Sequence, residues 1–99
     1  MSKKLSGVEL IAEERRHQIN DLDFTTQKDM AYRNGELVDA ALAYAKAAST
    51  QSDKCPSGWP WSENTWKPQS PIENLVRAGA LIAAEIDRLQ NEMENSGKN

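Results

Sequence analysis

All three tryptophans of the chain, Trp59, Trp61 and Trp66, lie within one short segment. Only two tyrosines and one phenylalanine lie elsewhere, so this segment holds most of the large aromatic surface. Indole rings stack on nucleobases of any type, with about 1–3 kcal/mol per base. Lys67 follows the last indole and Arg77 comes soon after it, and such cations pair with phosphate. These residue types and their spacing indicate a site for a flat, anionic small molecule.

A structural role for the same indoles is the alternative. Three large rings in a loop that also contains proline add apolar area to the core. A chain of 99 residues has only a limited core of its own. The sequence leaves both roles open, and one indole can fill both.

Two residues on expected helices are further candidates for this site. Arg15 falls within the apolar stripe of the first helix, and a cation on a buried face needs a carboxylate or a ligand phosphate. A salt bridge to Glu36, Asp39 or Glu85 is its structural alternative. Tyr44, on the second helix, is a further stacking candidate. The predicted ligand-binding residues are Trp59, Trp61, Trp66, Lys67, Arg77, Arg15 and Tyr44.

Acidic residues offer a different chemistry. Glu36 and Asp39 are three positions apart, and Glu13 and Glu14 are adjacent on the helix before them. This pattern partly resembles the all-α, MazG-like nucleotide pyrophosphohydrolases, in which paired acidic motifs hold Mg²⁺ against a pyrophosphate. Acidic residues on solvated helix faces give the same pattern. The pyrophosphohydrolase is therefore an alternative, and the main prediction contains no catalytic residue, metal or cofactor.

Composition and single residues narrow the function classes. Twelve basic against fifteen acidic residues give a net charge of -3, which is unlike the basic face of a duplex-binding protein. Cys55 is the only cysteine and His17 the only histidine, which excludes an intrachain disulfide and a histidine pair for zinc. We interpret His17 as a surface histidine. With neither a secretory leader nor a long apolar run, we expect a cytoplasmic protein without a membrane partner.

Three helices are expected to position these residues, over about residues 7–20, 35–49 and 70–94. The first begins at a capping box of Ser6 and Glu9, whose side chains satisfy each other's backbone amides. The second is rich in alanine, the residue with the highest helix propensity. The third has the same kind of start as the first, with proline at its first helical position.

The expected fold class is all-α, a small bundle of about three helices. We expect a single domain over residues 1–99, with flexible ends over about 1–5 and 95–99. A short helical piece is expected near residues 25–33. The connection from 49 to 69 holds three of the four prolines and all three tryptophans. Because disordered segments are poor in aromatic residues, we expect a long ordered loop there.

The third helix carries an apolar repeat and is too long for the other two helices to cover. Its apolar positions alternate steps of three and four, the pattern of a helix that pairs with another helix. We therefore expect a homo-oligomer through this face. The predicted interface residues are Ile72, Leu75, Gly79, Ile82, Ile86, Leu89 and Met93.

Four segments in this order resemble a family of small phage and prophage proteins. They are GVELIAEER over residues 7–15, GEL with its alanine and tyrosine positions over 35–45, WPW and WKP over 59–68, and LVRAGALIAAEI over 75–86. Small phage proteins of this size commonly act by binding. One such class consists of molecular sponges, helical oligomers that sequester the nucleotide signals of anti-phage systems such as CBASS and Thoeris.

The residues and the resemblance together predict a phage-type, non-enzymatic binding protein. It is expected to sequester a small nucleotide-derived ligand with the tryptophan segment, in the host cytoplasm, and so to counter host defence. A protein-binding inhibitor of a host factor is one alternative, because tryptophan is enriched at interface hot spots. The Mg²⁺-dependent pyrophosphohydrolase is the other. Further copies of the chain are the second expected partner, and duplex nucleic acid is not expected.

Overall fold

The computed structural model describes residues 4–20 and 34–96, and in these ranges the chain is helical without strands. This confirms the all-α class. The short helical piece expected near residues 25–33 lies outside the described residues. The elements are α1 (Gly7–Asn20), α3 (Glu36–Thr50), the 3₁₀ turn η1 (Glu63–Thr65) and α4 (Pro71–Ser96).

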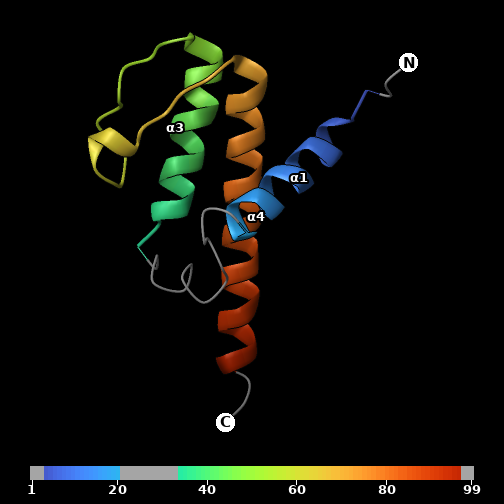
Figure 1. Cartoon of the computed structure of the whole chain (residues 1–99). Coiled ribbons are helices and arrows are strands. Elements are labelled where there is room, and N and C mark those ends of the chain that lie inside the picture. Colours follow the sequence, from blue (N-terminus) through green and yellow to red (C-terminus); the bar gives the residue numbers. More distant parts are fainter. Residues whose placement is uncertain (1–3, 21–33, 97–99) are drawn as a thin grey trace.

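Helix α4 is the central element (Figure 1). It packs along α3 and is crossed by α1, whereas α1 and α3 make no close backbone contact with each other. With 26 residues, α4 is about 39 Å long at 1.5 Å per residue. Its C-terminal half continues beyond the N-terminal end of α3 (Figure 1), as expected from the sequence. The helix ends at Ser96, two residues after the predicted end.

The starts of α1 and α4 both have the predicted serine cap, and in α1 the glutamate also completes the capping box. In α1, Ser6 N–H donates to Glu9 Oε1 at 2.8 Å, and Glu9 N–H donates to Ser6 Oγ at 3.2 Å. In α4, Glu73 N–H donates to Ser70 Oγ at 3.3 Å, and that hydroxyl donates to Glu73 Oε1 at 2.8 Å. These bonds join residues three apart, so local sequence is enough to specify where both helices begin.

The core lies between α3 and α4 and consists largely of alanine. Small side chains let the two helix backbones approach closely, but each buries little apolar area. The fully buried Leu37 and the loop residue Trp66 supply larger side chains to this core. The buried alanines are Ala40, Ala41, Ala43 and Ala47 on α3 and Ala78, Ala80 and Ala84 on α4.

Gly79 lies at a tight contact between α4 and Ile11 of α1. A Cβ atom at this position would lie 2.5 Å from Ile11 Cδ1 and 2.9 Å from Ile11 Cγ1, so any larger residue would require the Ile11 side chain to move. Glycine therefore provides the notch into which Ile11 packs. The sequence predicted Gly79 as part of an intermolecular face, and the structure instead places it against α1 of the same chain.

The other residues of the apolar repeat lie on the surface of α4. Their exposed fractions run from 44% for Leu89 to 73% for Met93. Ile72, Leu75, Ile82 and Ile86 fall between these values.

Among the helices described, none combines the length and the apolar character needed to cross a membrane.

Candidate functional site

Trp66 anchors the loop between α3 and α4 to the core. Its ring is buried and its centroid lies 4.8 Å from that of Tyr44. Its Nε1 donates to the carbonyl oxygen of Asp53 at 3.0 Å, which ties the two ends of the loop together. Trp66 was predicted to stack on a ligand, but here its ring faces are covered by protein, so its observed role is structural.

The Trp59 ring lies between those of Tyr44 and Trp61 and contacts both. Its centroid lies 5.5 Å from that of Tyr44 and 5.4 Å from that of Trp61, and both pairs are edge-to-face. Its Nε1 donates to the carbonyl oxygen of Ser62 at 3.2 Å and to Thr65 Oγ1 at 3.1 Å. Edge-to-face pairs favour this interlocked order beyond their buried area. The rings therefore form one aromatic cluster rather than independent surface groups.

The end of the loop that enters α4 is held by two side chains of that helix. Asn74 is buried, and its amide accepts from Gln69 N–H at 2.7 Å and donates to the Gln69 carbonyl oxygen at 3.1 Å. Arg77 Nη1 donates to the carbonyl oxygen of Lys67 at 2.6 Å. The Arg77 guanidinium also lies over the Tyr44 ring, 5.7 Å from its centroid. These contacts give the loop a defined position relative to both helices.

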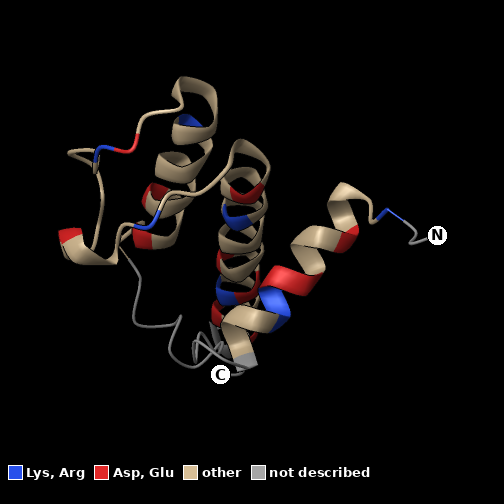
Figure 2. Cartoon of the chain, turned by 45° about the horizontal axis from the view of Figure 1, so that its top comes forward, with Lys and Arg blue, Asp and Glu red and all other residues tan. Residues whose placement is uncertain are grey.

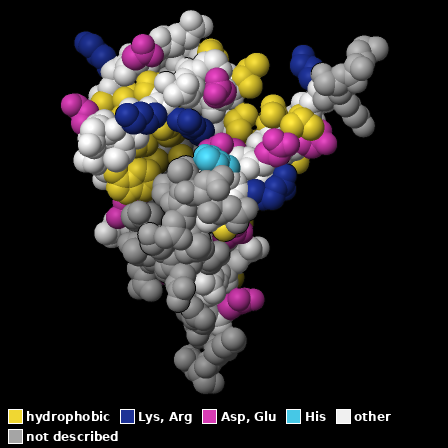
Figure 3. All heavy atoms as spheres, viewed as in Figure 1, with side chains coloured by type: hydrophobic (Ala, Val, Ile, Leu, Met, Phe, Trp, Pro, Cys, Tyr) yellow, Lys and Arg dark blue, Asp and Glu magenta, His cyan; other side chains and the backbone are white. Residues whose placement is uncertain are grey.

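A cavity of about 300 Å³ opens between α1, the loop and the α3–α4 pair. On one face of the molecule, basic side chains and a histidine gather beside hydrophobic side chains (Figure 3). Lining residues come from every described helix and from the loop. They are Glu14, His17 and Gln18 of α1, Tyr44 of α3, Trp59, Trp61, Thr65 and Lys67 of the loop, and Arg77 and Leu81 of α4.

Most of the predicted ligand-binding residues thus border one cavity, although they come from distant parts of the sequence. Tyr44, Trp59, Trp61, Lys67 and Arg77 all line it. Tyr44 was predicted to stack on the ligand, but its ring is buried against Trp66 and beneath the Arg77 guanidinium, so it supports the wall from behind. The half-buried Trp59 and Trp61 supply apolar faces, and the two cations supply positive charge. Such a combination suits a ligand with a flat ring and an anionic group.

Arg15 was also predicted for this site, and the structure places it elsewhere. Its side chain is buried, and Nη2 lies 3.2 Å from Asp87 Oδ2 of α4. A carboxylate does accompany this cation, as expected, but it is none of the three that the sequence suggested. Glu36 and Asp39 lie on α3, against which α1 does not pack, and Glu85 on α4 is bonded to Arg88 instead.

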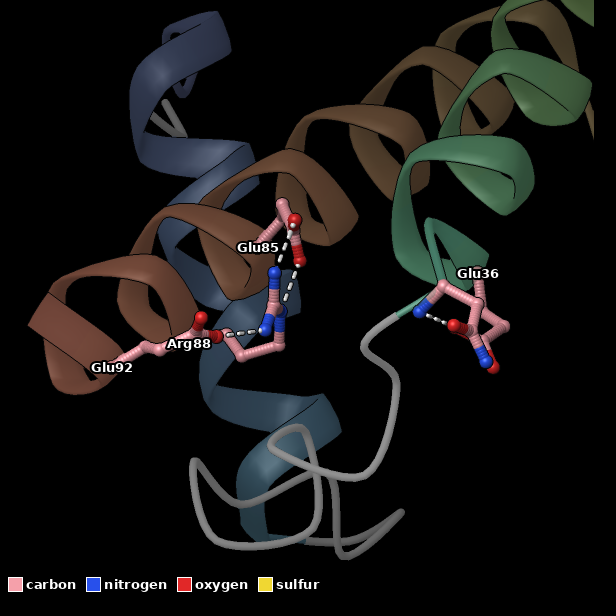
Figure 4. Close-up of polar contacts among 5 residues, drawn as sticks. Glu36, Glu85, Arg88 and Glu92 are labelled. Atoms are coloured by element: carbon pink, nitrogen blue, oxygen red, sulfur yellow. Dashed lines mark hydrogen bonds and ion pairs between the residues drawn. The ribbon is translucent and has the colours of Figure 1, made fainter.

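The acidic residues considered for Mg²⁺ are dispersed. Glu36 Oε1 accepts from the backbone N–H of Asn34 at 2.8 Å, at the start of α3 (Figure 4). Glu14 lies on α1 at the cavity, whereas Glu13 and Asp39 are exposed. In residues 4–20 and 34–96, no three His, Cys, Asp or Glu side chains come close enough to share a metal ion.

An ionic cluster around a buried arginine of α4 was not anticipated. Arg88 is buried and donates to Glu85 Oε1 at 2.7 Å, to Glu85 Oε2 at 3.0 Å and to Glu92 Oε2 at 2.7 Å (Figure 4). The hydrogen bonds to Glu85 raise the pKa of Arg88 above its ordinary value, against the opposing effect of burial. Charges spaced three and four apart are also typical of solvated helices, so the sequence carried no signal of this burial.

Charge is otherwise mixed along the helices. Basic and acidic positions are interspersed on α1 and α4 (Figure 2), unlike the basic face of a duplex-binding protein.

The thiol of Cys55 is half-buried, and its pKa is raised, first by desolvation and then by the nearby charge of Glu63. A raised pKa lowers the thiolate population, so Cys55 is a poor nucleophile.

Sequence reasoning missed three cavity residues on α1, namely Glu14, His17 and Gln18. His17 is exposed, as expected, but it borders the cavity. Their spacing of three and four places them on one helix face. That spacing was a usable signal, but only the crossing of α1 over α4 directs this face toward the loop.

Comparison with known proteins adds no relative: no family model, no curated protein and no solved structure matches the chain. The site is interpreted from its own geometry and chemistry.

Proposed function

We propose that this chain is a non-enzymatic binding protein that sequesters a small nucleotide-derived ligand in the cavity beneath its tryptophan loop. The observation that carries the proposal is the joint presence of aromatic faces and two cations around one cavity of about 300 Å³. This volume is at the lower end of small-molecule sites and suits a ligand of about mononucleotide size. A base would stack on the rings, and its phosphate would pair with Lys67 and Arg77.

The contacts of Arg77 support its role as a phosphate ligand. A guanidinium has five N–H donors, and Nη1 is used by the Lys67 carbonyl oxygen at 2.6 Å. Other donors of the same fork are available for a phosphate group. The bond to the Lys67 backbone also keeps the two cationic residues close together. The arrangement provides local positive charge in a chain of net charge -3, which favours a small anion over a duplex.

The chemistry of the walls favours binding over turnover. Ring faces, an arginine and a lysine hold a ligand, whereas hydrolysis of a pyrophosphate by Mg²⁺ needs clustered carboxylates. Glu14 is the carboxylate that lines the cavity among the described residues. The ligand is therefore expected to leave the site chemically unchanged.

We propose further that the chain forms a homo-oligomer through the exposed apolar repeat of α4. Six large apolar side chains of this repeat are at least 44% exposed, from Ile72 to Met93. A heptad repeat is complementary to a second copy of itself, so the same face of another chain would cover it. Because α4 also supplies Arg77 to the cavity, oligomer formation and ligand binding would involve the same helix.

The resemblance to small phage and prophage proteins supports a biological setting for this activity. In the cytoplasm of an infected host, sequestration would lower the concentration of a nucleotide signal and so counter anti-phage defence. The amount of signal removed would follow the amount of protein made, because a protein without turnover binds its ligand stoichiometrically.

Thermal shift and calorimetry against linear and cyclic nucleotides, with Mg²⁺ and with EDTA, test the proposal. We expect metal-independent binding and recovery of the intact ligand. Lys67→Met should weaken binding, whereas Lys46→Met, which removes an exposed cation of α3 outside the cavity, should not. Turnover that is lost in Glu36→Gln would instead establish the pyrophosphohydrolase. Stable capture of a host protein without any nucleotide binding would favour the inhibitor.

A further inference from the structure

We infer that the cavity selects a nucleobase with an exocyclic amino group, and that Gln18 reads this group by a hydrogen bond. The inference rests on the proposed nucleotide binding and extends it to the class of base. Gln18 lies on α1 and lines the cavity, yet its side chain is almost entirely buried, with 3% of the residue exposed. A polar side chain at such a position is well placed to recognise a ligand rather than solvent.

The amide oxygen of Gln18 lacks a hydrogen-bond donor within the part of the chain that the structure describes. Its Oε1 is buried, and no group in residues 4–20 and 34–96 donates to it. Buried side-chain oxygens nearly always accept a hydrogen bond, because an unmade bond leaves the cost of desolvation uncompensated. An N–H group of a ligand in the cavity would supply the missing donor.

The cavity residues near Gln18 determine which hydrogen-bond donor of a bound base can reach its amide oxygen. A base stacked on Trp59 or Trp61 presents its polar edge to the remaining walls of the cavity. On α1, Glu14 lies one turn before Gln18 and also lines the cavity, so that helix offers two oxygen acceptors. An amino group donates two hydrogens and satisfies such acceptors. An oxo group at the same position would bring a further acceptor against them, which is unfavourable.

A glutamine amide is also able to donate, through Nε2, to the ring nitrogen next to an amino group. This paired contact is the one by which glutamine recognises adenine in nucleic acids. Cytosine has the same neighbouring pair of an amino group and a ring nitrogen. The shared chemistry is therefore an amino group beside a ring nitrogen, and the experiment separates the purine from the pyrimidine.

A consequence for the unliganded protein distinguishes recognition from a structural role. Gln18→Leu removes a buried amide oxygen that receives no hydrogen bond, and leaves an apolar side chain of similar size. The melting temperature of the unliganded variant should therefore equal or exceed that of the natural chain. A glutamine that stabilised the fold through its amide would give the opposite change.

The test measures the affinities of AMP against IMP and of CMP against UMP by calorimetry. In each pair an amino group is replaced by an oxo group. We expect at least one amino nucleotide to bind about tenfold or more tightly than its oxo partner, since a site built to receive a hydrogen bond rejects a ligand that cannot make it. In Gln18→Leu and Gln18→Met the ratio should fall to about threefold or less. Gln90→Leu, at an exposed glutamine of α4, serves as the control and should leave the ratio unchanged.

Failures of the two proposals have different signatures. Equal binding of both members in each pair, or a preference that persists in both Gln18 variants, would overturn this inference and leave nucleotide binding intact. A lower melting temperature in both variants would likewise show that the amide is satisfied within the protein. If only cyclic dinucleotides bind, cyclic di-AMP and its deaminated form replace the first pair. If no nucleotide binds at all, the proposed function fails and this inference with it.

Discussion

Arg77 Nη1 donates a hydrogen bond to the backbone carbonyl oxygen of Lys67 at 2.6 Å, which ties the first turns of α4 to the loop before it. The same guanidinium lies 5.7 Å from the ring centroid of Tyr44 on α3. This side chain of α4 therefore joins the loop and α3, the two segments that carry the aromatic wall of the cavity. A cavity braced in this way needs little rearrangement on binding, which favours affinity.

Arg77→Lys should weaken nucleotide binding about tenfold, or about 1.4 kcal/mol. Lysine keeps the positive charge but lacks the planar guanidinium, whose several N–H groups can donate to the Lys67 carbonyl oxygen and to a phosphate at the same time. Calorimetry with the best ligand of the nucleotide panel measures the change. Arg16→Lys, at an exposed arginine of α1, is the matched control and should have no effect. Equal affinities for both variants would contradict the role given to Arg77.

We expect Trp66→Ala to reduce mainly the stability of the fold and Trp61→Ala to reduce mainly the affinity for a nucleotide. Trp66 is buried in the core, so its truncation should lower the free energy of unfolding by about 3–5 kcal/mol. Trp61 is half-buried and lines the cavity, so its truncation should lower the affinity for a nucleotide by about 1–3 kcal/mol, with a smaller loss of stability. Urea unfolding and calorimetry separate the two quantities. Similar stability losses with unchanged affinity would assign both indoles to the core.

Ile86→Glu should dissociate the proposed oligomer. Ile86 is 50% exposed in the middle of the apolar repeat of α4, and a charge there would have to be buried at the interface. Light scattering coupled to size exclusion, over a range of concentrations, gives the mass. Leu42→Glu is the control, because Leu42 is 61% exposed on α3, outside the repeat, and should leave the mass unchanged. A natural chain that is strictly monomeric at all concentrations would refute the proposed interface.

The capping box of α1 should make stability depend on pH. Hydrogen bonds from the backbone and the side chain of Ser6 lower the pKa of Glu9 below its ordinary value of 4.5. A carboxyl whose pKa is lower in the folded chain stabilises the fold fully above the unfolded value. This contribution is lost as the pH falls through the folded value. Thermal melts from about pH 6 to about pH 3 should show this loss. The matching Glu9→Gln variant, which does not titrate at this position, should show a smaller decline.

The starts of the helices were predictable because their signals are local. Ser6 with Glu9 and Ser70 with Glu73 make their hydrogen bonds within one turn, as the residue types indicate. The exposed apolar repeat was predictable for a similar reason. A helix of known length presents each residue at a fixed angle, so periodicity alone places Ile82 and Ile86 on one face. Periodicity does not determine whether another chain packs against that face.

The three indoles show where local signals end. Trp61 and Trp66 are five positions apart in the same loop, and nothing in their type distinguishes them. The path of the loop buries Trp66 against α3, with its Nε1 bonded to the Asp53 carbonyl oxygen, and leaves Trp61 at the cavity. That path depends on contacts with Tyr44, Asn74 and other distant residues. No spacing rule connects those residues to the loop.

By itself, the sequence determined the all-α class, the helix boundaries to within a few residues, and the concentration of aromatic and cationic residues around one loop. Each of these follows from interactions within a few positions of the chain. Only the tertiary structure decided that α1 crosses α4 at the notch of Gly79, because that contact joins positions 11 and 79. The crossing pairs Arg15 with Asp87 and directs Gln18 into the cavity. Such packing depends on long-range shape complementarity, which residue types and periodicity leave open.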